Sequence, residues 1–207
     1  GGDCSKGENI MISITAIGKQ GQLKLRRSAC KPREVLLTTG IHGLSKLGLL
    51  VKTNQINQTD FNLSQQLVDL SVNKFTKPRP KYEAVTKIIE SKNNSKKNEI
   101  GCTDSSDGFY QAVLDLSKES KCKAIVDYQK IPKNKFWPKG KRWDQYYFFG
   151  GEDYELLISL PKEWANNLKK IDSEIFEIGY FIKGKPGIEI KNCPANFSLE
   201  NDSFSHF

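Results

Sequence analysis

The chain has 207 residues and a formal net charge of +8 at pH 7, and its composition is 37% hydrophobic and 27% charged. These fractions are typical of a globular protein, and no apolar run approaches the roughly 20 residues that a membrane helix needs. The basic residues are mixed with acids along the chain and do not alternate with aromatic residues. We therefore expect neither a nucleic acid nor a membrane as a partner.

The cysteines and histidines disfavour further classes of site and of enzyme. The five cysteines form no C-x-x-C pair and are odd in number, which disfavours a disulfide framework or a zinc site and indicates a reducing, cytoplasmic location. His42 and His206 are the only histidines. A hydrolase built on a histidine base is therefore disfavoured.

The first half of the chain predicts two strands and three helices. Alternating isoleucines predict a strand at residues 10–17, and the run EVLLTT predicts another at 34–39. A glycine-punctuated loop then enters a helix, and helical periodicity follows at 61–74 and 82–91. The breaker KPRPK separates these last two helices, and the polar run 91–99 is expected to be a loop.

The second half predicts alternating strands and helices. Strands are expected at 99–103 and 123–128, with an amphipathic helix between them that begins at Phe109. Residues 154–160 are apolar on both faces, which predicts a buried strand, and Pro161 marks the start of a helix. Two late strands, 174–182 and 187–190, complete an α+β fold: one mixed sheet with packed helices.

The stretch TDSSDG, residues 103–108, lies between a predicted strand and a predicted helix. It allows two interpretations. Ser105 or Ser106 caps the helix, with Asp107 favourably placed near its positive end. Alternatively, Asp104 and Asp107 converge on a Mg²⁺ ion, because this cation prefers one or two carboxylates plus substrate phosphates.

Two further stretches combine glycines with acids. GGEDYELL, residues 150–157, is either a tight turn with solvated acids or a loop that presents Glu152 or Asp153 to a ligand. The opening residues, Gly-Gly-Asp, place Asp3 beside the first predicted strand in the same way. Three such sites together favour metal-phosphate chemistry, yet no P-loop and no protein-kinase motif is present.

The order GGD, RRSACKP, TTGIHGLSKLGLL, KPRPK, TDSSDGF, FFGGEDYELL and SFSHF resembles the thiamine-monophosphate kinase family. That family belongs to the superfamily of aminoimidazole ribonucleotide synthetase and selenophosphate synthetase. The resemblance runs from the first residue to the last. It implies a cytoplasmic enzyme that transfers the γ-phosphoryl group of ATP to thiamine monophosphate and makes thiamine diphosphate.

The resemblance also implies roles for individual residues. Asp3, Asp104 and Asp107 would bind several Mg²⁺ ions, and Arg27 and Ser106 would contact ATP. Glu152 and Phe204 would contact thiamine monophosphate.

The acceptor in this reaction is itself a phosphate, which is already largely ionised at pH 7. The reaction therefore needs charge neutralisation and alignment rather than a general base.

The sequence departs from the family pattern at several positions, namely Ala29, Arg33, Glu34, Lys46, Leu47 and Lys81. These departures affect the expected nucleotide side of the site. They leave Asp104, Asp107 and Glu152 unchanged.

The resemblance also predicts the domain organisation. Residues 1–19 would be the last strand of a missing amino-terminal domain, and residues 20–207 the carboxy-terminal, synthetase-like domain. The family's amino-terminal domain supplies further metal ligands and most of a homodimer interface. We therefore expect a homodimer when the protein is full length, and an inactive fragment without that domain.

Two alternatives remain open from the sequence. One is a sister ATP-dependent synthetase of the same superfamily. The other is a non-catalytic domain that binds nucleotides or anions, which has no need for Glu152 or a terminal aromatic residue.

Overall fold

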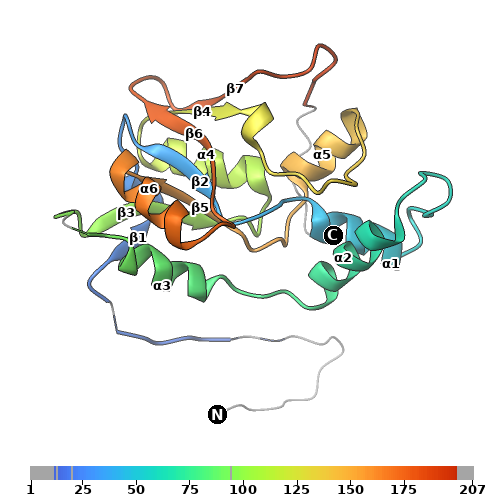
Figure 1. Ribbon diagram of the computed structural model, residues 1–207, viewed down its shortest axis with the longest axis horizontal. Coiled ribbons are helices and arrows are strands. Elements are labelled where there is room, and N and C mark those ends of the chain that lie inside the picture. The colour runs from blue at the N-terminus through green and yellow to red at the C-terminus, as the bar shows by residue number, and fades with distance from the viewer. Residues whose placement is uncertain (1–11, 13, 20, 94, 200–207) are drawn as a thin grey trace.

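The computed structural model describes residues 12, 14–19, 21–93 and 95–199. Its centre is one mixed sheet with the strand order β1-β3-β5-β2-β6-β4-β7 (Figure 1). The pairs β1/β3 and β4/β7 are parallel, and the four other pairs are antiparallel. The strands are β1 (Lys24–Arg26), β2 (Val35–Thr38), β3 (Glu99–Asp104), β4 (Lys123–Asp127), β5 (Leu156–Leu160), β6 (Phe176–Ile182) and β7 (Gly187–Lys191).

Helices cover both faces of this sheet, so the predicted α+β architecture is confirmed. The α-helices of the described residues are α1 (Leu44–Lys52), α2 (Gln65–Thr76), α3 (Tyr82–Glu90), α4 (Phe109–Glu119), α5 (Lys141–Phe149) and α6 (Lys162–Ile171). Two short 3₁₀ helices, η1 (Arg27–Ala29) and η2 (Tyr128–Lys130), follow β1 and β4.

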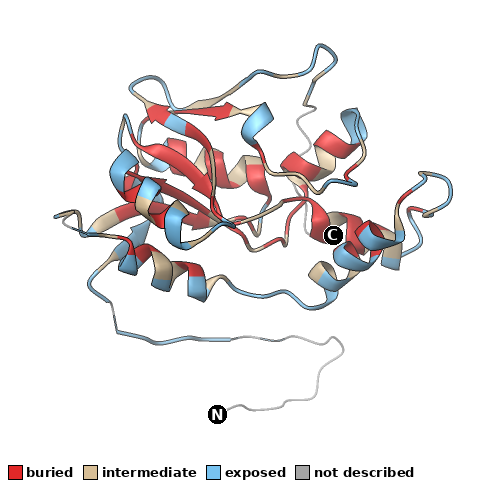
Figure 2. Ribbon diagram, in the orientation of Figure 1, coloured by how far each residue is buried: buried red, intermediate tan, exposed pale blue. Residues whose placement is uncertain are grey.

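The two faces of the sheet carry separate hydrophobic cores. Strand β2 illustrates the division, because Leu36 packs into the core with α1, α2, α4 and α5, while Val35 and Leu37 pack into the core with α3 and α6. All four residues of β2 are buried, and Figure 2 shows the central strands in the buried colour. A strand buried on both faces has a continuous apolar sequence rather than an alternating one.

Most of the predicted elements are present. The predicted helix at 61–74 begins later, at Gln65, because the side chain of Ser64 accepts a hydrogen bond from the Leu67 N–H and caps the helix there. The predicted strand at 10–17 falls partly outside the described residues. Its described residues, 12 and 14–17, form no strand.

One strand and one α-helix were not predicted from the sequence, β1 and α5. Helix α5 has the sequence KRWDQYYFF, in which aromatic residues crowd the carboxy-terminal end and Lys141, Arg142 and Asp144 interrupt the apolar pattern. Its burial comes from Trp143, Tyr147 and Phe148, which pack into the core shared with α4. In the described part of the chain no helix is both long and apolar enough to cross a membrane.

Candidate functional site

The TDSSDG stretch forms a sharp turn from β3 into α4. Strand β3 ends at Asp104, and Gly108 adopts a φ of 94° immediately before the helix, a conformation that favours glycine. The N-cap residue of α4 is this glycine, and the Ser105 Oγ accepts from the Glu155 N–H rather than from an N–H of the helix. The interpretation that Ser105 or Ser106 caps the helix is therefore wrong. The Ser105 side chain instead binds the GGEDYE turn.

Ser105 instead joins this turn to the GGEDYE turn. Its backbone N–H donates to the Glu155 carbonyl oxygen at 2.9 Å, and its Oγ accepts from the Glu155 N–H at 3.1 Å. The Glu152 N–H donates to the Ser106 carbonyl oxygen at 2.8 Å. Strands β3 and β5 are antiparallel neighbours, and Asp104 at the end of β3 lies opposite Leu156 at the start of β5. The two turns therefore lie side by side at the same end of these strands. Asp104, Ser106 and Glu152 are thus brought together.

The GGEDYE turn holds Glu152 in an unusual backbone conformation. Glu152 has a φ of 64° and Tyr154 a φ of 53°, both in the left-handed region that non-glycine residues rarely occupy. At Gly150 any side chain would collide with the Tyr146 carbonyl oxygen and with Lys46. The turn is therefore held closely against α1 and α5, and the Glu152 side chain stays half-exposed.

The adjacent acid, Asp153, has a different role. It is 1% exposed, and its carboxylate accepts hydrogen bonds from the N–H groups of Gly43 (2.6 Å) and Ser45 (2.9 Å) at the start of α1. Burial raises the pKa of Asp153 to about 7, even though both backbone donors favour the ionised form. The interpretation that Asp153 is presented to a ligand is wrong, because its oxygens bind the amino-terminal end of a helix.

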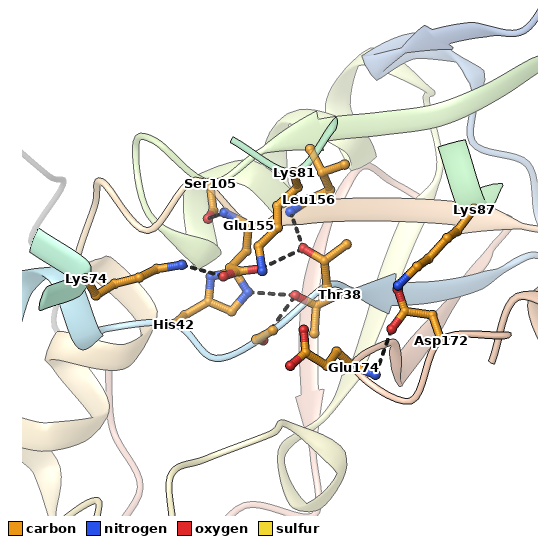
Figure 3. A network of polar contacts seen from close by, with 12 residues as sticks. Thr38, His42, Lys74, Lys81, Lys87, Ser105, Glu155, Leu156, Asp172 and Glu174 are labelled. Carbon is orange, nitrogen blue, oxygen red and sulfur yellow. Dashed lines mark hydrogen bonds and ion pairs between the residues drawn. The ribbon is translucent and has the colours of Figure 1, made fainter. Parts of the chain in front are cut away.

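Glu155 is the third acid of this turn and is 2% exposed. It accepts hydrogen bonds from Thr39 Oγ1 (2.7 Å) and Lys74 Nζ (2.5 Å), and its second ion pair is with Lys81 Nζ (3.0 Å). Figure 3 shows both lysines pointing toward Glu155 from different segments. Sequence reasoning missed this network, because the residues that bind Glu155 are distant from it in the chain.

Arg27 lies at the same end of the molecule as the TDSSDG turn. It occupies η1, directly after β1, which pairs with β3. Its Nε donates to Thr103 Oγ1 at 3.0 Å, and its guanidinium lies 3.6 Å from Asp115 of α4. The side chain is 51% exposed. A guanidinium group is therefore fixed beside the end of β3 and remains accessible to an anion.

His42 is unsuited to acid–base chemistry. It is fully buried, its Nε2 lies 2.8 Å from Thr38 Oγ1, and rings of Phe109 and Tyr147 pack against it. Burial, together with the positive charges of Lys74 and Lys81, lowers the pKa of His42 to about 3. The imidazole is therefore neutral at pH 7.

The assignment of Mg²⁺ to Asp104 and Asp107 stays a prediction. Among the described residues, no three or more His, Cys, Asp or Glu side chains are grouped so that they could hold a metal ion by themselves. Asp104 is half-exposed and Asp107 exposed on the same turn, which fits an ion that takes one or two carboxylates and completes its shell with phosphates and water. Asp3, Phe204 and His206 lie outside the described residues.

Several departures from the family pattern are accommodated within the fold. Lys81 forms the ion pair with Glu155, and Leu47 is fully buried in the core. Arg33 has a φ of 77° in the turn before β2, where the family has glycine. Glu34 is buried, accepts from Ser159 Oγ and the Lys31 N–H, and pairs with Lys97.

Comparisons with known proteins agree with the resemblance. No protein-family model matches this sequence. The chain is 38% identical over 207 residues to the thiamine-monophosphate kinase of a Prochlorococcus marinus strain, in a match that covers 100% of this chain and 62% of that protein. The chain therefore spans less than two thirds of the length of this relative.

Solved structures share the fold. The chain superposes with a TM-score of 0.66 on a structure described as AaThiL complexed with AMPPCP and TMP, at 22% identity and covering 87% of this chain and 53% of that one. The hydrogenase maturation protein HypE gives a TM-score of 0.54 at 13% identity, covering 86% of this chain and 56% of that one. These likenesses show that the α+β fold is shared with both proteins.

Proposed function

We propose that the protein containing this chain is an ATP-dependent kinase that phosphorylates thiamine monophosphate to thiamine diphosphate. Similarity to thiamine-monophosphate kinases along the whole chain supports this proposal. The observation that carries it is the joining of the TDSSDG and GGEDYE turns, which brings Asp104, Ser106 and Glu152 to the same end of β3 and β5.

In this proposal Asp104 and Asp107 hold Mg²⁺. When bound, the ion neutralises charge on the phosphates and aligns them for in-line transfer. Ser106 contacts ATP, and Arg27 contacts its phosphates, for which a guanidinium fork is well suited.

Glu152 orients thiamine monophosphate. Its backbone is held by the hydrogen bond to Ser106, so the acceptor side and the metal side of the site keep a fixed relation. Phe204 is proposed to contact the same substrate.

The proposed chemistry requires no general base from the protein. An acceptor phosphate is largely ionised at pH 7, and the buried, neutral His42 has no route to a reacting atom. The structural position of His42 is thus compatible with a reaction that depends on charge neutralisation.

We propose further that turnover needs sequence beyond these 207 residues. The chain spans 62% of the length of its relative, and phosphoryl transfer between two anionic substrates depends on cationic groups placed around both. A cytoplasmic location and a homodimer are part of the same proposal, as is a domain boundary near residue 19.

The test is formation of thiamine diphosphate from thiamine monophosphate, ATP and Mg²⁺, measured for the whole protein and for the 207-residue chain. We expect turnover by the whole protein and none detectable by the chain. ATP binding without formation of thiamine diphosphate by the whole protein would overturn the kinase assignment. Equal turnover by both would overturn the proposal that the site needs further sequence.

A further inference from the structure

A cleft lies on the side of the molecule formed by α2 and α3, next to the Glu155 network. Its volume is about 660 Å³, which is within the range of small-molecule sites. Its walls are the end of α2, the 77–81 segment, the first turns of α3, and the residues that follow α6. Thr39, at the end of β2, lies at its base beside the Glu155 network.

One end of this cleft is strongly cationic. Lys74, Lys77, Arg79 and Lys81 line it, and within the described residues the only carboxylate that pairs with any of them is Glu155. Lys74 and Lys81 share that single carboxylate, so the three groups keep one net positive charge. Lys77 and Arg79 are exposed, and neither forms an ion pair within the described part of the chain.

The cationic end is also held in place. The side chains of Lys74 and Lys81 are only 18% and 25% exposed, and each is fixed by a different oxygen of Glu155. Helix α3 starts immediately after Lys81 without a side-chain cap from the described residues, so its free N–H groups add to the positive potential there. An anion entering this end would meet donors that are already ordered.

The other end of the cleft is acidic. Glu83, Asp172 and Glu174 line it together with one cation, Lys87. Lys87 Nζ lies 2.9 Å from the Asp172 carboxylate, and Figure 3 shows the two side chains meeting. This hydrogen bond, together with the nearby charges of Asp172, Glu83 and Glu174, raises the pKa of Lys87. Three carboxylates around one ammonium leave a net negative charge.

Tyr82 is the first residue of α3 and follows the cationic residue Lys81 and precedes the acidic residue Glu83 in the chain. Its side chain is 69% exposed. An exposed aromatic ring beside carboxylates is a suitable surface for an organic cation, which is attracted to the face of the ring. The cleft therefore offers a site for negative charge and a site for positive charge on the same short segment.

We propose that this cleft binds a small phosphate ester that also carries a positively charged group. The phosphate lies among Lys77, Arg79 and the Lys74–Lys81 pair, where charge-assisted hydrogen bonds are available. The cationic group lies against Tyr82 and Glu83. The proposal does not depend on the kinase activity proposed above and would stand without it.

Phosphocholine is the probe, because it combines a phosphate monoester with a quaternary ammonium group. We expect calorimetry on the full chain to show that it binds at least about fivefold more tightly than inorganic phosphate or choline, since each of these makes only one of the two sets of contacts. Equal affinities for phosphocholine and inorganic phosphate, or no binding of phosphocholine, would overturn the proposal.

A pair of double variants locates the phosphate. Lys77→Gln with Arg79→Gln should weaken phosphocholine binding at least about tenfold, because two charge-assisted contacts are lost. Lys183→Gln with Lys185→Gln removes the same charge from exposed residues between β6 and β7, outside this cleft, and should leave binding unchanged. An equal loss of affinity in both double variants would mean that binding depends only on the net charge of the protein, and would overturn the proposal that the phosphate binds in this cleft.

Two further variants test the acidic end of the cleft separately and test whether the probe binds at the joined TDSSDG and GGEDYE turns instead. Glu83→Gln with Glu174→Gln should remove the advantage of phosphocholine over inorganic phosphate while inorganic phosphate still binds. Glu152→Gln, at the proposed thiamine monophosphate site, should not change phosphocholine binding. If Glu152→Gln abolishes binding while the Lys77 and Arg79 variant retains it, the ligand occupies the other site and the proposal fails.

Discussion

Two sets of carboxylates lie on neighbouring turns of this molecule but have opposite environments. Asp104 and Glu152 are half-exposed, and within the described chain neither pairs with a lysine or an arginine. Asp153 and Glu155 are almost completely buried, and each binds at least two donors from the protein. The outer pair is available to a ligand, whereas the inner pair holds the turns that present it.

The difference follows from alternation along the GGEDYE turn. Residues 151, 153 and 155 are buried while 152, 154 and 156 are half-exposed. Consecutive acids therefore serve different purposes: Glu155 fixes the turn to β2, α2 and the 77–81 segment, while Glu152 faces outward. An acid-rich motif is thus not a set of equivalent ligands, and each carboxylate has to be assigned by its own partners.

The largest effect that this comparison predicts is on stability, at Glu155. Glu155→Gln should lower the free energy of unfolding by about 3 kcal/mol, because it leaves the partly buried Lys74 and Lys81 facing each other without a carboxylate. Urea unfolding measures the change. Glu189→Gln, which breaks a more exposed pair with Lys123, should have a much smaller effect on stability. Equal losses of unfolding free energy in the two variants would mean that the buried Glu155 stabilises the fold no more than an exposed acid does.

A somewhat smaller effect is expected from the protonation of Asp153. Burial raises its pKa from 3.8 to about 7. Between these values the folded state keeps a proton that the unfolded state has lost, so this group makes stability fall as pH rises, and the fall ends above about pH 7. Relative to Asp153→Asn, the unmodified protein should lose about 2 kcal/mol of unfolding free energy between pH 5 and 7.

Paired urea titrations across that pH range compare the two proteins. The slopes matter rather than the absolute stabilities, since asparagine also changes the hydrogen bonds at the start of α1. Parallel pH profiles would mean that Asp153 is ionised throughout, stabilised by the Gly43 and Ser45 N–H groups.

The outer acids should instead affect turnover. In the whole protein, Asp104→Asn or Asp107→Asn should lower turnover at least about tenfold, equivalent to about 1.4 kcal/mol of transition-state stabilisation, with unfolding free energy nearly unchanged. Asp60→Asn, in the exposed loop before α2, is the matched control. Unchanged turnover and Mg²⁺ dependence would show that these aspartates are not metal ligands.

The smallest effect is a difference between two substrates. Glu152→Gln or Phe204→Ala should raise the KM for thiamine monophosphate about fivefold more than the KM for ATP, since about 1 kcal/mol of binding is removed on one side only. Steady-state kinetics with each substrate varied in turn measures it. Equal changes in both KM values would mean that the acceptor site has been placed wrongly.

The sequence alone determined the fold class and the position of most elements. Continuous apolar runs such as EVLLTT and YELLISL are intrinsic signals of strands buried on both faces, and the regular spacing of apolar residues predicted the helices. Helix α5 lacked such spacing, so its identity depended on packing of Trp143, Tyr147 and Phe148 against other elements.

The tertiary structure decided which polar residues bind other parts of the chain and which remain exposed. The sequence selected Asp104, Asp107 and Glu152, but it could not distinguish Asp153 as a buried helix cap or reveal that Lys74 and Lys81 meet Glu155. Those contacts join residues far apart in the chain, and they form only when α1, α2 and the 77–81 segment fold against the end of the sheet. Local patterns record whether a side chain is polar and on which face it lies, whereas its partner is set by the packing of distant segments.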